Sequence, residues 1–299
     1  MEPECPNPEG PPAWLRAWRW TRAPLLGLLL GWGVVKGVDR LRIARLSPQE
    51  RSALAHEHCL RAQAISDEAC RRLGVGPINL PEDVIDDMID EYSRALEIDS
   101  GHLEALHDRA YWRSYSGAPR GALRDYDELL RLDPGNALAW YQRGGLHCSG
   151  GDHAAAISDY TRSLEIQAHR PGSAVLGARA RCRRETGDWT GALADLEADG
   201  GYDSLGIADC LQALGRHDEA VKAYDRYLRN SAAPEVLYRR GRSRFAAGNR
   251  TGAIEDFTGA CQQDGPARAE AEAFVREHPG DPMSDALREA LKRLPEEVR

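Results

Sequence analysis

A short pattern of small, apolar and polar residues returns along the chain. It reads alanine, an apolar residue, a variable residue, aspartate, then an aromatic residue or leucine. The copies are Ala122–Tyr126, Ala156–Tyr160, Ala192–Leu196 and Ala253–Phe257, with a more divergent one at Ala220–Tyr224. Each copy follows a turn centred on Gly117, Gly151, Gly187, Gly248 or Gly215, respectively. The pattern predicts pairs of helices joined by tight glycine turns.

The first helix of each pair carries a small residue seven places before the turn glycine. These residues are Ala110, Gly144, Ala180, Ala208 and Gly241. Asp99–His102 and Asp133–Asn136 play the same connecting role 34 residues apart, and the units that follow them align without a gap. The third copy is followed by its successor after only 28 residues, so we expect its second helix, near 192–198, to be short.

A 34-residue period of two helices, with small residues in the first and alanine then an aromatic in the second, resembles the tetratricopeptide repeat (TPR). The resemblance covers residues 83–265 and implies an all-α, right-handed TPR solenoid of helix-turn-helix repeats with capping helices at both ends. The small residues would let the paired helices approach closely, and the aromatic would fill the gap to the next unit. The expected units are a partial one at 83–102, then 103–136, 137–172, 173–200, 201–233 and 234–265.

Both flanks of the array are expected to be helical. Ser47-Pro48-Gln49-Glu50 predicts a capping box that opens a helix running to Leu73, where Gly74 stops it. Residues 47–82 would thus form an irregular helical cap and loop, whose helix pairs with Asp83–Ile98. Residues 266–299 would form C-terminal capping helices.

One pair of positions changes together across the units. The seventh place is Arg109, Arg143, Arg179 and Arg240 in four units, and the twenty-third place of the same units is Asp125, Asp159, Asp195 and Asp256. The unit at 201–233 has Ile207 and Ala223 instead. Loss of both partners together predicts an Arg–Asp ion pair across each helix hairpin, with a structural role.

Residues 1–46 form a separate block with four of the seven tryptophans. Seven basic groups against four acidic ones give this block a net charge of +3. Within it, the uncharged run 23–35 lies between Arg22 and Lys36, with tryptophans at its flanks, as at a membrane interface, and the hydrophobic stretch extends over 23–38 if Lys36 snorkels. It is short for a spanning helix. Two interpretations therefore stay open, a membrane anchor that leaves the repeats on the cytoplasmic side and a short buried helix.

The charge of the remainder bears on the class of partner. The chain carries −8, so residues 47–299 carry −11. This disfavours nucleic acid, because binders of nucleic acid normally present a basic face. Seven cysteines, an odd and sparse set, are typical of unpaired thiols in a reducing compartment. We therefore expect a cytoplasmic protein, either free or attached to a membrane by the N-terminal segment.

No catalytic, cofactor or metal motif is present in the sequence. His56 and His58 are two places apart on different helix faces, and there is no His-Glu-x-x-His, Walker loop or Cys-x-x-Cys. Four cysteines in repeat helices are interpreted as small buried hydrophobic residues: Cys148, Cys182, Cys210 and Cys261. The prediction is a protein that is not an enzyme, without cofactor, metal ion or small-molecule substrate.

The TPR resemblance implies a concave face, lined by the first helices, that binds a partner's peptide or helix. Tyrosine and arginine are enriched in protein interfaces. The candidate partner-binding residues of these two types are Tyr111, Tyr115, Tyr141, Arg181, Arg184, Tyr238, Arg239 and Arg242. The four arginines suit the carboxylates of an acidic ligand. The alternative is a solvated face neutralised by local acids such as Glu185 and Asp188.

The sequence thus favours a scaffold or adaptor that binds a peptide or helix of a partner protein. Two other classes remain as alternatives. One is an enzyme, or a non-catalytic subunit of one, with a site in the irregular region 47–100. The other is an RNA-binding helical repeat, which the negative charge disfavours.

Overall fold

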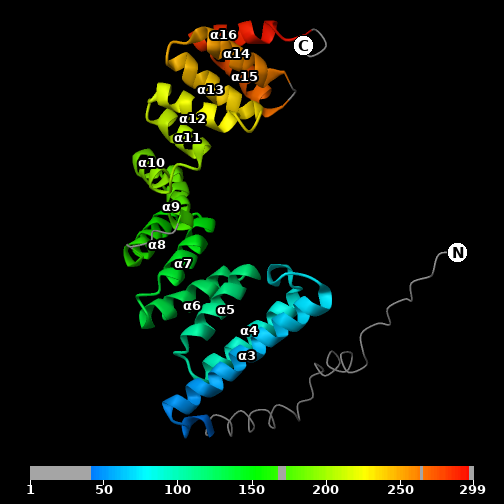
Figure 1. Ribbon diagram of the computed structural model, residues 1–299, viewed down its shortest axis with the longest axis vertical. Helices are drawn as coiled ribbons and strands as arrows, with labels where there is room; N and C mark the ends of the chain where they lie inside the picture. Colours follow the sequence, from blue (N-terminus) through cyan, green and yellow to red (C-terminus); the bar gives the residue numbers. More distant parts are fainter. Residues whose placement is uncertain (1–41, 168–172, 263–264, 296–299) are drawn as a thin grey trace, which may run out of the picture. The chain divides into compact units, whose positions relative to one another are not determined.

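The computed structural model describes residues 42–167, 173–262 and 265–295, and these form helices without any strand (Figure 1). The all-α prediction is therefore confirmed for the described part of the chain. A long helix α3 (Pro48–Leu73), a 3-10 turn η1 (Pro77–Asn79) and α4 (Glu82–Ile98) come first. The repeat helices follow: α5 (Leu103–Tyr115), α6 (Pro119–Leu132), α7 (Ala137–Ser149), α8 (His153–Ile166), α9 (Ser173–Glu185), α10 (Trp189–Ala198), α11 (Ser204–Ala213), α12 (His217–Leu228), α13 (Pro234–Ala246) and α14 (Arg250–Cys261). The last two helices are α15 (Pro266–Glu277) and α16 (Pro282–Lys292).

The described helices divide into two compact units, the first ending at Ala105 and the second beginning at Leu106. In the first unit, α3 packs along α4. The predicted capping box is present, since Ser47 Oγ accepts from the Glu50 backbone N–H and Glu50 Oε2 accepts from that of Ser47. Gly74 ends α3 with φ 66°, a conformation that favours glycine. A buried Glu91 carboxylate on α4 lies 2.7 Å from Nδ1 of His58 on α3 and ties the two helices together.

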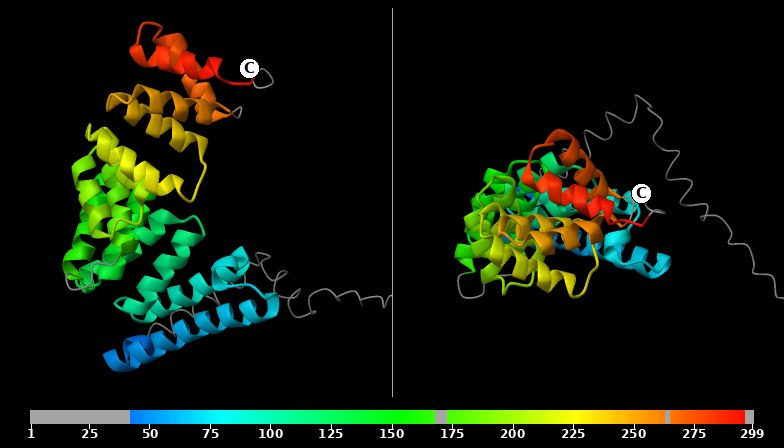
Figure 2. Two further views of the ribbon diagram at one scale, coloured as in Figure 1. Left: turned by 45° about the horizontal axis from the view of Figure 1, so that its top comes forward. Right: turned by 90° about the horizontal axis from the view of Figure 1, so that it is seen from above.

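The second unit is a series of antiparallel helix hairpins, each packed on the next (Figures 1 and 2). The predicted turn glycines all adopt the left-handed conformation, with φ between 72° and 84°: Gly117, Gly151, Gly187, Gly215 and Gly248. A side chain would be strained there, so glycine is the residue that lets the second helix fold back. The second helix of the third hairpin, α10, has only 10 residues, as the shortened spacing predicted.

Close approach of the two helices in a hairpin explains the small residue in the first. A Cβ at Gly144 would lie 2.9 Å from Cε1 of Tyr160, and one at Gly241 would lie 2.6 Å from Cε1 of Phe257. The aromatic rings of the second helices fill the space against these glycines, and Phe257 is completely buried. The predicted close approach of the two helices is therefore confirmed at both hairpins, and the ring that fills the space against the glycine comes from the same hairpin, whereas the sequence prediction placed the aromatic against the next unit.

The predicted Arg–Asp pairs are all present, each with two parallel hydrogen bonds. Arg143 Nε and Nη2 donate to Asp159 Oδ2 and Oδ1 at 2.9 and 2.7 Å. The same fork joins three further pairs, with every distance between 2.6 and 3.0 Å: Arg109–Asp125, Arg179–Asp195 and Arg240–Asp256. The four aspartates are 3–4% exposed. The hydrogen-bonded Asp159 carboxylate raises the pKa of Arg143, so the pair stays charged.

Each fork belongs to a larger network than the sequence indicated. A second basic side chain, one turn further along the first helix, also reaches the aspartate: Arg113, Arg183 and Arg244 at 2.7–2.9 Å, and His147 at 4.0 Å. The remaining guanidinium nitrogen of the first arginine bonds the preceding hairpin. Arg143 Nη1 donates to Asp127 at 2.7 Å and Arg240 Nη1 to Asp225 at 2.6 Å. One arginine therefore fixes a hairpin internally and joins it to its neighbour.

The hairpin without this pair is held by apolar packing. Ile207 and Ala223 occupy the two places and are 4% and 0% exposed. They lie in one apolar cluster with Leu193, Leu211 and Tyr224. Replacing a buried ion pair by well-packed apolar residues costs little stability, so the substitution is compatible with the fold.

Helices α15 and α16 lie beyond the last hairpin and cover its apolar side (Figure 2). Phe257 of α14, Ala271 of α15 and Leu287 of α16 are buried in one cluster. This closes the apolar face that a further repeat would otherwise cover.

The hydrophobic stretch 23–38 lies outside the described residues. Among the helices that are described, none is both long and apolar enough to cross a membrane.

We expect Asp159→Ala to be more destabilising than the double change Arg143→Ala with Asp159→Ala. The single change leaves a guanidinium that is largely buried without its main partner, at a cost of about 3 kcal/mol, and the double change removes that unpaired charge. Urea unfolding of the wild type, both single variants and the double variant gives the coupling energy. Zero coupling would contradict the pairing.

We expect Gly241→Ala to lower the free energy of unfolding by about 1 kcal/mol, because the added methyl group must displace Phe257 from a filled core. Gly145→Ala is the matched control. Its Cβ would meet only Tyr160 Oη at 3.8 Å, so better helix propensity should raise stability by about 0.5–1 kcal/mol. The midpoints of thermal unfolding measure both effects. Shifts of the same sign and size in the two variants would refute close packing as the reason for glycine at position 241.

Candidate peptide-binding surface

The first helices of the five full hairpins present equivalent places to one side. Counting from the first residue of each predicted unit, the ninth place holds Tyr111, Gly145, Arg181, Asp209 and Arg242 on α5, α7, α9, α11 and α13. The remaining candidate residues lie before or after the ninth place on the same helices: Tyr115, Tyr141, Arg184, Tyr238 and Arg239. We call Arg181, Arg184, Arg239 and Arg242 the arginine surface.

Asp209 joins two members of the arginine surface. Its Oδ2 accepts from Arg184 Nη2 at 3.2 Å and from Arg239 Nη1 at 3.0 Å. The carboxylate is 15% exposed, whereas the side chains of Arg184 and Arg239 are 31% and 45% exposed. One internal carboxylate therefore lies between guanidinium groups from the hairpins before and after it.

A buried tyrosine fixes Asp209 in place. The Tyr224 hydroxyl lies 2.9 Å from Asp209 Oδ1 and 2.7 Å from Gln212 Oε1, and Ser243 Oγ donates to the same Gln212 oxygen at 3.2 Å. Burial, followed by the Asp209 charge, raises the pKa of Tyr224, so the phenol stays protonated and remains a donor. This network links α11, α12 and α13 beneath the arginine surface.

The other two arginines are less neutralised. Arg242 Nη1 lies 3.8 Å from Glu270 Oε1, and both side chains are more than 40% exposed. Arg181 is exposed and makes no ion pair with any described residue. Four arginines facing Asp209 and Glu270 leave an excess of two positive charges, in a unit that is acidic overall.

Three of the predicted tyrosines lie on the earlier hairpins. Tyr115 is 49% exposed, and its neighbour Trp112 packs edge-on against both Tyr111 and Tyr115. Tyr141 is half-buried, with its ring centroid 5.8 Å from that of Tyr160. These three tyrosines retain surface that a partner could contact.

Tyr238 does not belong to this surface. It is 2% exposed and packs against Phe257 at 5.5 Å, and burial raises its pKa to about 12. Its side chain belongs to the buried cluster that includes residues of the capping helices α15 and α16, so Tyr238 is a core residue. The sequence prediction that it binds a partner is set aside for this reason.

The pairing of Asp209 with two arginines was not predicted from the sequence, which pointed to Glu185 and Asp188 as neutralising acids. Asp188 does lie 3.4 Å from a guanidinium nitrogen, but that of Arg183. The repeat spacing of the sequence did indicate on which side of the array Asp209 lies. Asp209 occupies the same ninth place as Arg181 and Arg242, so it had to lie on their side of the array.

Comparison with known proteins agrees with the repeat architecture. A model of the tetratricopeptide repeat family matches residues 108–171 and 205–282. Together with the hairpins described above, this match shows that these two segments consist of tetratricopeptide repeats. A comparison with curated protein sequences finds no match.

Solved TPR structures share this fold. YrrB, a TPR protein with an unusual peptide-binding site, is 19% identical, with a TM-score of 0.56 over 61% of this chain and 97% of YrrB. PilF of Pseudomonas aeruginosa is 15% identical, with a TM-score of 0.50 over 78% of this chain and 98% of PilF. TPR proteins act as scaffolds for protein–protein interactions, and the repeat fold is generally non-catalytic.

Proposed function

We propose that this protein is an interaction scaffold that binds an acidic peptide or helix of a partner protein on the first helices of its repeats. The observation that carries the proposal is the arginine surface. Its guanidinium groups come from α9 and α13, and two of them, those of Arg184 and Arg239, are held on either side of Asp209 on α11. Guanidinium groups are well suited to carboxylates because they can donate two parallel hydrogen bonds to one carboxylate.

Asp209 shows how the surface would accept a carboxylate. It already fills the position between Arg184 and Arg239, whereas Arg181 and Arg242 keep exposed donors on the same ninth place of the neighbouring hairpins. A peptide lying along the first helices would place its acidic groups at Arg181 and Arg242. The half-exposed Tyr111, Tyr115 and Tyr141 would add apolar contacts at the earlier hairpins.

We expect Arg181→Glu with Arg242→Glu to weaken binding of acidic peptides by at least tenfold, because the change replaces attraction by repulsion. Asp209→Asn should tighten it, since the amide keeps an acceptor for Tyr224 but removes the competing charge. The measurement uses extended synthetic peptides made in acidic, neutral and basic versions, with fluorescence anisotropy as readout.

The matched control for the double variant is Arg131→Glu with Arg162→Glu. These arginines lie on the second helices α6 and α8 and are 65% and 52% exposed, and among the residues that the structure describes each pairs only with an acid three residues away. The control makes the same change of charge away from the proposed surface and should leave peptide binding unchanged. Equal loss in both double variants, or no preference for acidic peptides, would refute the proposal.

We further propose that the N-terminal stretch 23–38 tethers this scaffold to a membrane, with the repeats in the cytoplasm. Support comes from the sequence alone, namely the uncharged run between basic residues and the concentration of tryptophan. The full-length chain expressed in cells should stay in the membrane fraction after carbonate extraction, and a chain beginning at Ser47 should be released. Complete release of the full-length chain would refute the tether and leave the peptide-binding proposal standing.

A further inference from the structure

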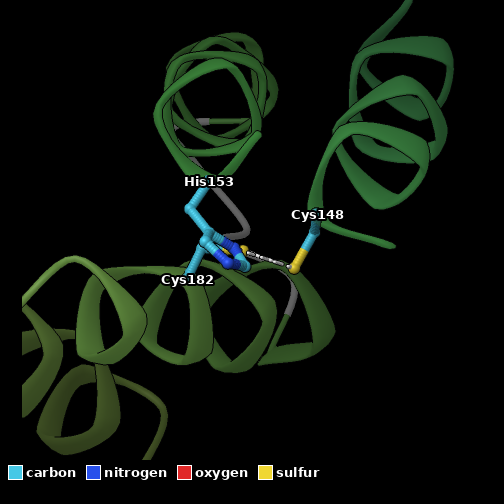
Figure 3. A group of neighbouring side chains, drawn as sticks. All are labelled: Cys148, His153 and Cys182. Atoms are coloured by element: carbon cyan, nitrogen blue, oxygen red, sulfur yellow. Dashed lines mark hydrogen bonds between the residues drawn. The ribbon is translucent and has the colours of Figure 1, made fainter. Parts of the chain in front are cut away.

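Two cysteines and a histidine from three consecutive helices converge at one point (Figure 3). Cys148 lies in the last turn of α7, His153 is the first residue of α8, and Cys182 lies on α9. The Sγ atoms of Cys148 and Cys182 are 2.6 Å apart, and Cys148 Sγ is 3.9 Å from His153 Nδ1. The three potential ligand atoms all lie within 4.8 Å of one another.

The cluster differs from the other buried cysteines of the repeats. Cys210 and Cys261 are completely buried in apolar clusters, and neither belongs to a group of potential metal ligands among the described residues, as expected for cysteines that only fill space. Cys148 and His153 are only half-buried, which leaves the group accessible to an ion from solvent. Packing alone does not require two sulfur atoms and an imidazole nitrogen to converge.

The donor set matches one class of metal ion. Thiolate and imidazole together select Zn²⁺ and similar thiophilic ions, with Zn–S near 2.3 Å and Zn–N near 2.0–2.1 Å. In a tetrahedron with those bond lengths, the two sulfur atoms lie about 3.7 Å apart. To bind the ion, the two sulfur atoms must therefore separate from the present 2.6 Å by about 1 Å. The separation of Cys148 Sγ from His153 Nδ1 already suits such a site.

We propose that Cys148, His153 and Cys182 form a binding site for one Zn²⁺ ion. Two thiols each release a proton to solvent as they bind, His153 binds through neutral Nδ1, and the fourth position is open to water. The ion would connect α7 and the start of α8 to α9, and so clamp one repeat to the next. Arg181, next to Cys182 in the chain, belongs to the arginine surface, so the clamp would also stiffen part of that surface.

A second group, His56 with His102 and Glu104, also gathers three potential ligand atoms, and it carries no such proposal. There the contacts have an ordinary explanation. His56 Nδ1 lies 3.0 Å from Glu104 Oε2 as a hydrogen-bonded pair, and the two imidazole rings stack with centroids 6.0 Å apart.

The test uses the full-length chain, reduced and stripped of metal with a chelator, and then titrated with Zn²⁺ or Co²⁺ alone. We expect one equivalent to bind, with thiolate-to-cobalt charge-transfer absorption in the near ultraviolet. Saturating Zn²⁺ should raise the thermal unfolding midpoint by about 5 °C. Cys182→Ala and His153→Gln should each weaken binding at least about 100-fold and abolish the thermal shift.

Matched controls exist for both changes. Cys210 occupies the same place of α11 that Cys182 occupies in α9, and His217 begins α12 as His153 begins α8. Cys210→Ala and His217→Gln should therefore bind Zn²⁺ like the wild type. His153 is half-buried at the start of its helix, so His153→Gln tests the site without removing core volume. Failure of the reduced wild type to bind one equivalent would overturn the proposal. So would binding that survives Cys148→Ala with Cys182→Ala, or a Cys148–Cys182 disulfide that persists in reducing buffer.

Discussion

The described repeats depend above all on a buried aspartate that receives the guanidinium fork of an arginine across the helix hairpin. Four hairpins contain this pair, and each aspartate is nearly inaccessible to solvent. The net energy of such a pair is small, but its geometry is strict, because two parallel hydrogen bonds fix the distance and rotation of the two helices. A third bond from the same arginine then reaches the preceding hairpin, as Arg143 does to Asp127.

This constraint also positions the candidate binding surface. The arginine at the seventh place points into its hairpin, and two residues later the ninth place points outward, where Arg181 and Arg242 lie. In the hairpin of α11 and α12 the internal pair is replaced by Ile207 and Ala223, and a carboxylate appears at the ninth place instead. Asp209 thus serves as the ionic link between hairpins at the one described repeat that lacks the buried pair. It does so where the side chains of Arg184 and Arg239 are 31% and 45% exposed.

The structure separates roles that residue type alone does not. Tyr238 and Tyr141 occupy the same place of their first helices, yet Tyr238 is buried beside Phe257 under the C-terminal cap and Tyr141 keeps exposed surface. Cys182 and Cys210 also share a place, but only Cys182 meets a second sulfur and an imidazole. In both cases the difference comes from what the adjoining helix supplies.

The sequence by itself determined the helix hairpins, the left-handed turn glycines, the close packing at Gly144 and Gly241, the short α10 and the Arg–Asp pairs. These features repeat at nearly fixed spacing, and each depends on contacts within a single hairpin. Only the tertiary structure decided that Asp209 bridges Arg184 and Arg239, that Tyr238 is core, and that Cys148, His153 and Cys182 converge. The burial of Tyr238 reflects the cap. The contacts of Asp209 with Arg184 and Arg239, and of Cys148 with Cys182, join side chains 25 or more residues apart on different hairpins. Their geometry depends on how successive hairpins rotate against each other, which no local spacing records.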